Sequence, residues 1–315
     1  MTRTPEMTSA IVFPGMGPCE FTDVARFMLV DRDARDLLAT ASDALDYDLF
    51  ARYRDSDSDY SEYAQVAFLV NCVALARWAE RVMDLRPGLV AGPSFGGKAA
   101  AVYSGALDFA EAVRMTAQLS RIETEYFATE QRGVVTMSFV RTPQDRLRDI
   151  LGELDEAGEW YEISCYVDTD FWMVTLHEGR TDWLAQRLRA GGGLPLYVMD
   201  PPLHATAFQP LRDRVEAELF GSLHFTDPQI PVVADQDGTV RDTADGVRAM
   251  LLDGIVTPVR WPEVVGTFQR RGVETVHVCG PDRLWGRVGA TVRNFQTTIV
   301  DPRRAMSPIR RTVAV

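Results

Sequence analysis

The chain has 315 residues, of which 46% are hydrophobic and 25% are charged, as is typical of a folded globular protein. This length allows one large core and a smaller appended domain. A formal net charge of -12 argues against nucleic acid as a partner, because phosphate binding depends on clustered lysine and arginine. No run approaches 18 apolar residues, and residues 1–15 contain no stretch typical of a signal peptide. We therefore expect no membrane span and a cytoplasmic location.

The four cysteines stand far apart in the chain and form no C-x-x-C pair. This spacing favours reduced thiols over a disulfide framework or a zinc site. The four histidines include no H-E-x-x-H arrangement, so little is available to build a catalytic metal centre. We expect no bound metal.

Apolar strands and helical patterns alternate over the first 130 residues. The predicted strands are 9–13 and 88–91, and the predicted helices are 21–50, 61–83 and 109–127. This alternation predicts an α/β architecture, in which a parallel sheet has both faces covered by helices.

From residue 131 the order changes to strand, helix, strand, strand, helix, strand, which is typical of a ferredoxin-like unit. Its predicted elements are 134–140, 144–154, 161–167, 171–176, 182–190 and 194–198. We therefore expect a small ferredoxin-like domain over 131–198, inserted into a large α/β-hydrolase-like domain made of 1–130 and 199–315.

Two strands, 231–234 and 273–278, are expected to return to the main sheet after the insertion. The last dozen residues, which include two Arg-Arg pairs, are expected to form a loosely held tail.

Residues 92–96 read Gly-Pro-Ser-Phe-Gly, a G-x-S-x-G set between an apolar run and an alanine-rich run. This context predicts a sharp turn between a strand and a helix, with the Ser94 hydroxyl exposed at the start of the helix. The alternative interpretation is a glycine-rich turn with a solvated serine.

A serine hydroxyl needs a base within hydrogen-bond reach, and histidine is the usual choice near neutral pH. His204 follows Pro201-Pro202-Leu203, where the chain leaves the predicted insertion and re-enters the large domain. That position places His204 at a cleft, whereas an ordinary loop histidine is the alternative.

Five motifs, in the same order along the chain, resemble those of malonyl-CoA:acyl-carrier-protein transacylases and related polyketide acyltransferases. They are Phe13-Pro14-Gly15-Met16-Gly17, Gly92-Pro93-Ser94-Phe95-Gly96, Pro202-Leu203-His204, Val259-Arg260-Trp261 and Gly280-Pro281. The resemblance covers nearly the whole chain, and it implies an acyltransferase that works by a ping-pong mechanism.

The resemblance also implies a role for five residues. Ser94 would be the nucleophile and His204 the general base and then the acid. The backbone N–H groups of Met16 and Phe95 would form the oxyanion hole, which needs amide hydrogens rather than a particular side chain. The main-chain carbonyl of Gly254 would orient His204.

Some residues depart from the family pattern, and these departures bear on which acyl group the enzyme transfers. Where malonyl-specific relatives hold the substrate carboxylate with an arginine, this chain has Leu119, and an unpaired carboxylate in an apolar pocket is costly. Arg121 stands two residues further along the helix, a rotation of about 200°, so it should point elsewhere. Pro93 and Leu203 also replace family residues near the site. We therefore expect a non-carboxylated acyl group.

The stretch 125–130 and the small domain are most similar to discrete acyltransferases of vicenistatin-type macrolactam pathways, which start from a β-amino acid. This likeness implies transfer of an aminoacyl or dipeptidyl group between acyl carrier proteins in antibiotic biosynthesis. The enzyme would bind no cofactor and would act on phosphopantetheine thioesters of carrier proteins or CoA.

Gln65 is a candidate hydrogen-bonding residue of the pocket, or else a surface helix residue. Scattered arginines are candidates for docking the acidic carrier proteins, or else solvated charges. They are Arg121, Arg146, Arg148, Arg287 and Arg293.

Three other functions are weighed against this one. A malonyl transacylase could use Arg121 through a shifted helix register. A serine hydrolase or thioesterase of the α/β-hydrolase class usually has its histidine near the C-terminus, whereas 111 residues follow His204 here. A non-catalytic carrier-binding protein would not need the Ser94 and His204 pair.

Overall fold

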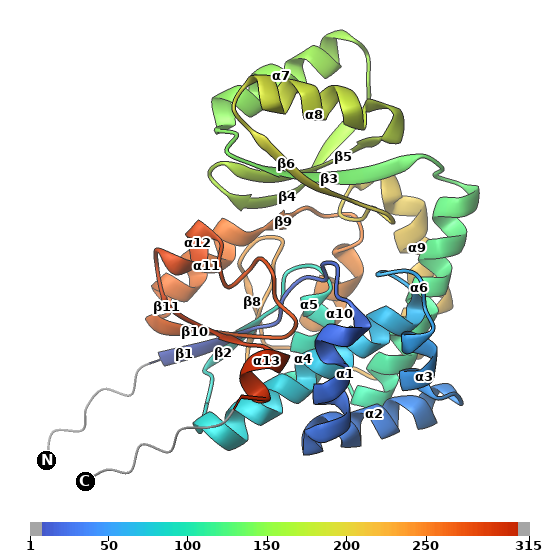
Figure 1. Cartoon of the computed structure of the whole chain (residues 1–315), viewed down its shortest axis with the longest axis vertical. Coiled ribbons are helices and arrows are strands. Elements are labelled where there is room, and N and C mark those ends of the chain that lie inside the picture. Colours follow the sequence, from blue (N-terminus) through green and yellow to red (C-terminus); the bar gives the residue numbers. More distant parts are fainter. Residues whose placement is uncertain (1–7, 308–315) are drawn as a thin grey trace, which may run out of the picture.

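The computed structural model describes residues 8–307, which form a lower part around a six-stranded sheet and an upper part around a five-stranded sheet (Figure 1). The lower sheet has the order β11-β10-β1-β2-β7-β8, in which only β8 is antiparallel to its neighbour. Its strands are β1 (Thr8–Val12), β2 (Leu89–Ala91), β7 (Val232–Val233), β8 (Val240–Arg241), β10 (Val273–Cys279) and β11 (Gln296–Val300).

Residues 8–130 contain six helices. They are α1 (Phe21–Val30), α2 (Arg32–Leu45), α3 (Leu49–Arg54), α4 (Glu62–Met83), α5 (Gly96–Tyr103) and α6 (Phe109–Thr129). The single helix predicted over 21–50 is wrong, because Asp31 is extended and its carboxylate caps the start of α2. Asp46 then ends α2 in the left-handed conformation.

Helices and short turns of 3-10 helix also follow the upper part in the chain. They are η2 (Thr206–Phe208), α9 (Gln209–Glu218), η3 (Phe220–Ser222), α10 (Ala244–Asp253), α11 (Trp261–Arg270), α12 (Gly289–Val292) and α13 (Pro302–Ala305). The predicted loose tail is wrong at α13, where the Arg303 guanidinium also pairs with Asp23. Residues 308–315 of that tail lie outside the described residues.

The upper sheet has the order β6-β3-β5-β4-β9, and α7 and α8 lie on the side away from the lower part (Figure 1). Its elements are β3 (Val134–Val140), α7 (Gln144–Glu156), β4 (Tyr161–Asp168), β5 (Phe171–His177), η1 (Glu178–Arg180), α8 (Thr181–Ala190), β6 (Leu194–Met199) and β9 (Val259–Arg260). The first four strands give the ferredoxin-like order, so the predicted fold class is confirmed. The fifth strand, β9, pairs in parallel with β4 and comes from the segment assigned to the large domain.

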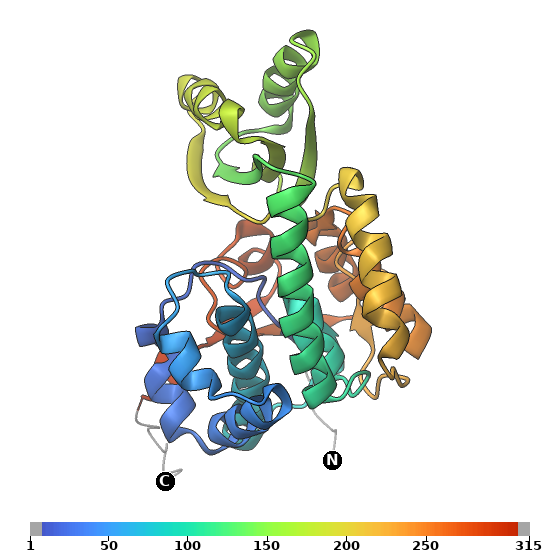
Figure 2. The ribbon, with the colours of Figure 1, turned by 90° about the vertical axis from the view of Figure 1, so that its right-hand side faces the viewer.

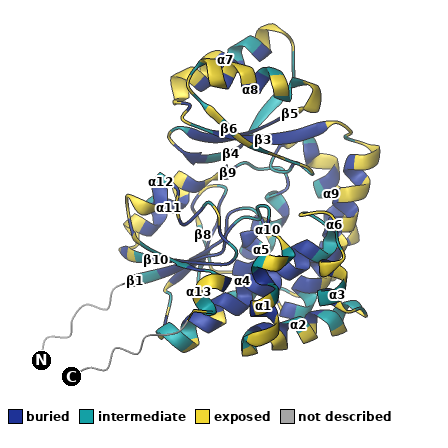
Figure 3. Ribbon diagram, in the orientation of Figure 1, coloured by how far each residue is buried: buried dark blue, intermediate teal, exposed yellow. Residues whose placement is uncertain are grey.

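The central strands β2 and β7 are buried along their whole length and β1 and β10 along most of theirs, as expected for a covered parallel sheet, whereas the edge strands β8 and β11 are mostly half-buried (Figure 3). Along β1 and the residue after it, Ile11 and Phe13 join the core on the α4 side, whereas Ala10 and Val12 join the core on the α11 side. The second core also includes Phe171 of the upper sheet. The lower and upper parts therefore share one apolar interface.

Polar contacts strengthen that interface. The Asp168 carboxylate at the end of β4 accepts hydrogen bonds from the Ala290 backbone N–H at 2.8 Å and the Arg293 guanidinium at 2.7 Å. Helix α6 rises along the lower part towards β3, so that it spans from one part to the other (Figure 2). Within residues 8–307, no helix is long and apolar enough to cross a membrane.

Candidate active site

Ser94 lies in the tight turn between β2 and α5 and has a φ of 55°, in the left-handed region. The turn requires glycine on both sides. A Cβ on Gly92 would lie 2.1 Å from the backbone of Gly96, and a Cβ on Gly96 would lie 2.1 Å from the Phe13 carbonyl oxygen. The glycines therefore allow the close backbone approach that presents the Ser94 hydroxyl at the start of α5.

His204 is brought to Ser94 from a distant part of the chain. The Ser94 Oγ and His204 Nε2 atoms are 2.7 Å apart, and His204 Nδ1 is 2.6 Å from the Gly254 carbonyl oxygen. A carbonyl only accepts, so Nδ1 carries the proton and Nε2 accepts the hydroxyl proton of Ser94. The structure thus places the three predicted groups in one chain of hydrogen bonds.

Burial lowers the pKa of His204 to about 4, and the Gly254 carbonyl partly opposes this effect. The imidazole is therefore neutral at physiological pH. A neutral imidazole is the form that can take a proton from Ser94.

Met16 and Phe95, whose backbone N–H groups are the predicted oxyanion donors, line the same cavity as Ser94. Among the described residues, neither group donates a hydrogen bond. Helix α5 begins directly after Phe95, so its positive dipole end also faces this point. The two free donors are suited to a developing oxyanion.

A cavity of about 550 Å³ opens beside Ser94 and His204, between the lower and upper parts. Gln65, Leu119 and Leu203 line it, as the sequence predicts. Pro93 does not line it: this residue is buried, and its carbonyl oxygen accepts the Gly96 N–H within the turn. The prediction of Pro93 as a pocket residue is therefore wrong.

Gln65 is buried, so the alternative of a surface helix residue is wrong. Its Nε2 donates to the Tyr60 carbonyl oxygen and to the Ser120 hydroxyl, each at 3.1 Å. Gln65 therefore fastens α4 to α6 at the wall of the cavity.

Arg121 points away from the cavity. Its guanidinium donates two hydrogen bonds of 2.6 Å to the Glu62 carboxylate, and its side chain is largely exposed. The Leu119 side chain on the same helix faces the cavity instead. The helix thus keeps the register that the sequence predicts for these two residues.

The other candidate docking arginines are scattered. Arg146 and Arg148 are exposed on α7, on the far side of the upper sheet (Figure 1). Arg293 binds Asp168 across the two parts, and Arg287 donates to the Asp282 carbonyl oxygen. The four arginines therefore do not share one surface with Arg121.

Sequence reasoning missed Asp235, which follows β7, the strand beside β2. The buried Asp235 carboxylate accepts the Ser94 backbone N–H at 2.6 Å. Burial raises the pKa of Asp235 to about 7, while the bond from Ser94 lowers it. An available signal was its place at the carboxyl end of a parallel strand, where sites of open α/β sheets form.

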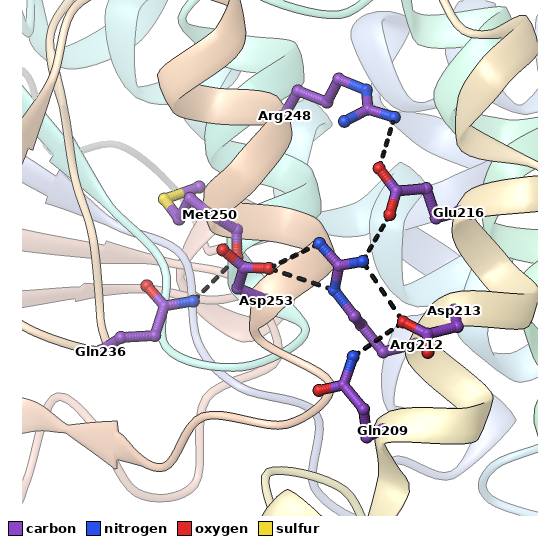
Figure 4. Close-up of polar contacts among 8 residues, drawn as sticks. All are labelled: Gln209, Arg212, Asp213, Glu216, Gln236, Arg248, Met250 and Asp253. Carbon is purple, nitrogen blue, oxygen red and sulfur yellow. Dashed lines mark hydrogen bonds and ion pairs between the residues drawn. The ribbon is translucent and has the colours of Figure 1, made fainter.

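A polar cluster behind the site was also missed (Figure 4). The Arg212 guanidinium on α9 binds Asp253, the last residue of α10, at 3.1 Å and also pairs with Glu216. Gln236, next to Asp235, donates to the Met250 carbonyl oxygen at 2.7 Å. These bonds fix the end of α10, whose next residue carries the carbonyl that orients His204.

Comparison with known proteins agrees with this geometry. Residues 138–199 match the family model described as the VinK acyltransferase small domain. The chain is 28% identical over 283 residues to the malonyl CoA-acyl carrier protein transacylase of Escherichia coli strain K12, covering 87% of this chain and 89% of that protein. It is 23% identical over 304 residues to the corresponding Bacillus subtilis strain 168 protein, covering 93% of each.

Solved structures share the fold. The malonyl CoA-acyl carrier protein transacylase of Coxiella burnetii superposes with a TM-score of 0.83 at 24% identity, over 95% of this chain and 96% of that one. The acyl-carrier-protein S-malonyltransferase of Burkholderia pseudomallei superposes with a TM-score of 0.81 at 26% identity, over 95% and 98%. The chain is therefore an acyltransferase similar to the malonyl CoA-acyl carrier protein transacylases.

Proposed function

We propose that this enzyme moves a non-carboxylated acyl group between acyl carrier proteins through an ester on Ser94. The Ser94 oxygen attacks the thioester carbonyl while His204 Nε2 takes the hydroxyl proton. The Met16 and Phe95 N–H groups stabilise the oxyanion. The C–S bond then breaks, and the phosphopantetheine thiol leaves with the proton from His204. The thiol of a second carrier reverses these steps.

The observation that carries the choice of acyl group is the place of Leu119. Its apolar side chain lines the cavity, whereas the nearby Arg121 is bound to Glu62 outside it. A malonyl carboxylate beside Leu119 would lose its hydration without gaining a partner there.

The match of residues 138–199 to the VinK acyltransferase small domain supports an acyltransferase of that kind. By the resemblance given in the sequence analysis, the group would be aminoacyl or dipeptidyl, in the assembly of a polyketide macrolactam in the cytoplasm. One similar solved structure is a type II polyketide acyl carrier protein in complex with its malonyl-transacylase, which supports carrier proteins as partners.

A malonyl transacylase is the second candidate. The names of the relatives favour it, and so does Lys98, whose side chain lines the cavity and could pair with a carboxylate.

Replacing Leu119 by arginine separates the two candidates. Acylation of Ser94 by malonyl-CoA and by a neutral or aminoacyl carrier-protein thioester would be timed by intact-protein mass spectrometry. We expect the wild type to prefer the non-carboxylated group at least tenfold, and Leu119→Arg to shift that ratio at least tenfold towards malonyl. Leu119→Met, which keeps the site apolar, is the control. A wild type that loads malonyl faster would support the second candidate.

A further inference from the structure

We propose that Lys98 and Glu123 form a polar clamp that binds an amide group within the transferred acyl chain. This inference rests on the proposed acyl-enzyme at Ser94. Both side chains line the cavity that contains Ser94 and His204, and the chemistry described above uses neither of them.

The two residues lie close in sequence to the nucleophile and to Leu119. Lys98 is in the first turn of α5, four residues after Ser94. Glu123 is on α6, four residues and about one helical turn after Leu119. Two different helices thus direct opposite charges into the same cavity.

Neither charged group forms an ion pair within the described part of the chain. Glu123 is 3% exposed and has the Gln65 side-chain amide as its hydrogen-bonding neighbour, whereas Lys98 is half-buried. The Lys98 Nζ instead lies 4.4 Å from the centre of the Phe95 ring. A buried carboxylate and a half-buried ammonium group that form no ion pair are both available to a polar ligand in the cavity.

The two groups nevertheless influence each other. Burial raises the pKa of Glu123, and the Lys98 charge and the nearby Gln65 amide oppose that rise. Burial likewise lowers the pKa of Lys98, and Glu123 opposes that fall. The two charged groups therefore lie within electrostatic range of each other.

Only some ligand groups satisfy both residues. A carboxylate would gain Lys98 but meet the like charge of Glu123, and an ammonium group would do the reverse. A hydrocarbon chain would leave both without hydrogen bonds. An amide offers its C=O to Lys98 and its N–H to Glu123, so it completes both at once.

Two pantetheine thioesters with chains of equal length test the clamp: N-acetylglycyl, which contains an amide, and pentanoyl, which does not. The measurement is kcat/KM for Ser94 acylation, followed by intact-protein mass spectrometry. We expect the wild type to prefer the amide thioester at least tenfold. Lys98→Met/Glu123→Met should bring the ratio of the two rates to about one. Thr124→Val, an exposed neighbour on α6, is the control and should keep the preference.

If circular dichroism shows that the double variant is unfolded, Glu123→Gln replaces it, because this substitution keeps the shape of the side chain and removes its charge. Glu123→Gln should lower the preference for the amide thioester at least threefold. Equal wild-type rates, or a preference that survives the substitutions, would overturn the clamp and leave the Ser94 acyl-enzyme standing. Failure of both thioesters to acylate Ser94 would overturn the proposed function, and the clamp with it.

Discussion

At the scale of single residues, the reactive pair depends on two side chains held in unusual backbone conformations. Ser94 has a φ of 55° and His204 a φ of 65°, and each is fixed by a backbone hydrogen bond. The Ser94 N–H donates to Asp235, and the His204 N–H donates to the Ile255 carbonyl oxygen at 2.9 Å. These bonds offset the local strain of the left-handed region.

The loss of acylation rate at acid pH follows from the pKa of His204, which burial lowers to about 4. Protonation would remove the base, so the rate constant for Ser94 acylation should stay high as pH falls through 6.5 and be lost only near pH 4. Stopped acylation reactions between pH 4 and 8 measure this loss, with Asp235→Asn as a background free of the second titration. A midpoint near 6.5 in that background would mean that His204 is not buried as described.

The pKa of Asp235 shifts in the opposite direction to the pKa of His204. Its pKa is raised from 3.8 to about 7, so the folded state holds the proton more tightly, and folding loses stability as pH rises from about 4 through 7. Asp235→Asn avoids the buried charge while its amide oxygen still accepts the Ser94 N–H. We expect this variant to melt at a higher temperature than the wild type at pH 8 and at a similar temperature at pH 4. A lower melting temperature at pH 8 would contradict the account.

At the scale of elements, the turn between β2 and α5 depends on close backbone contact. A Cβ on Gly92 would lie 2.1 Å from the Gly96 carbonyl, so Gly92→Ala should lower the free energy of unfolding by about 3 kcal/mol or more. Gly152 on α7 has nothing within 4 Å of its Cβ position and is the matched control. Gly152→Ala should be neutral or slightly stabilising. Urea denaturation measures the free energy of unfolding of both variants. Equal values would argue against the described turn.

The sequence could predict elements whose signal is local. The Ser94 turn is marked by its glycines, and the ferredoxin-like unit by its alternating strands. Strand β9 has only two residues, and β11 reads as a mixture of threonines and apolar residues, so neither has a clear pattern of its own. Both strands form because neighbouring strands offer hydrogen bonds, which the sequence does not display.

Contacts between distant segments were also beyond the sequence. Asp235 lies 141 residues from Ser94, and Gly254 lies 50 residues from His204. Gly254 was reached through family resemblance, but Asp235 has no motif of its own. Lys98 and Glu123 have no sequence motif of their own, and only the packing of α5 and α6 brings both to the cavity.

At the scale of the whole molecule, the cavity exists because two parts meet. Asp168 is a buried link between them, since its carboxylate accepts from both Arg293 and Ala290. Asp168→Ala would leave those donors without their acceptor and should cost about 2–4 kcal/mol of stability. Asp170→Ala, in the same turn, is the control, because none of the hydrogen bonds or ion pairs among residues 8–307 uses the Asp170 side chain. Chemical denaturation measures both, and equal midpoints would mean that Asp168 does not hold the parts together.

The central claim is a non-carboxylated acyl ester on Ser94, and intact-protein mass spectrometry tests it most directly. Wild type and Ser94→Ala would be incubated briefly with malonyl-CoA and, separately, with an aminoacyl carrier-protein thioester. The account predicts an aminoacyl mass increase on the wild type, little or no malonyl increase, and no increase on Ser94→Ala. A malonyl increase alone on the wild type, or any acyl increase that survives in Ser94→Ala, would contradict it.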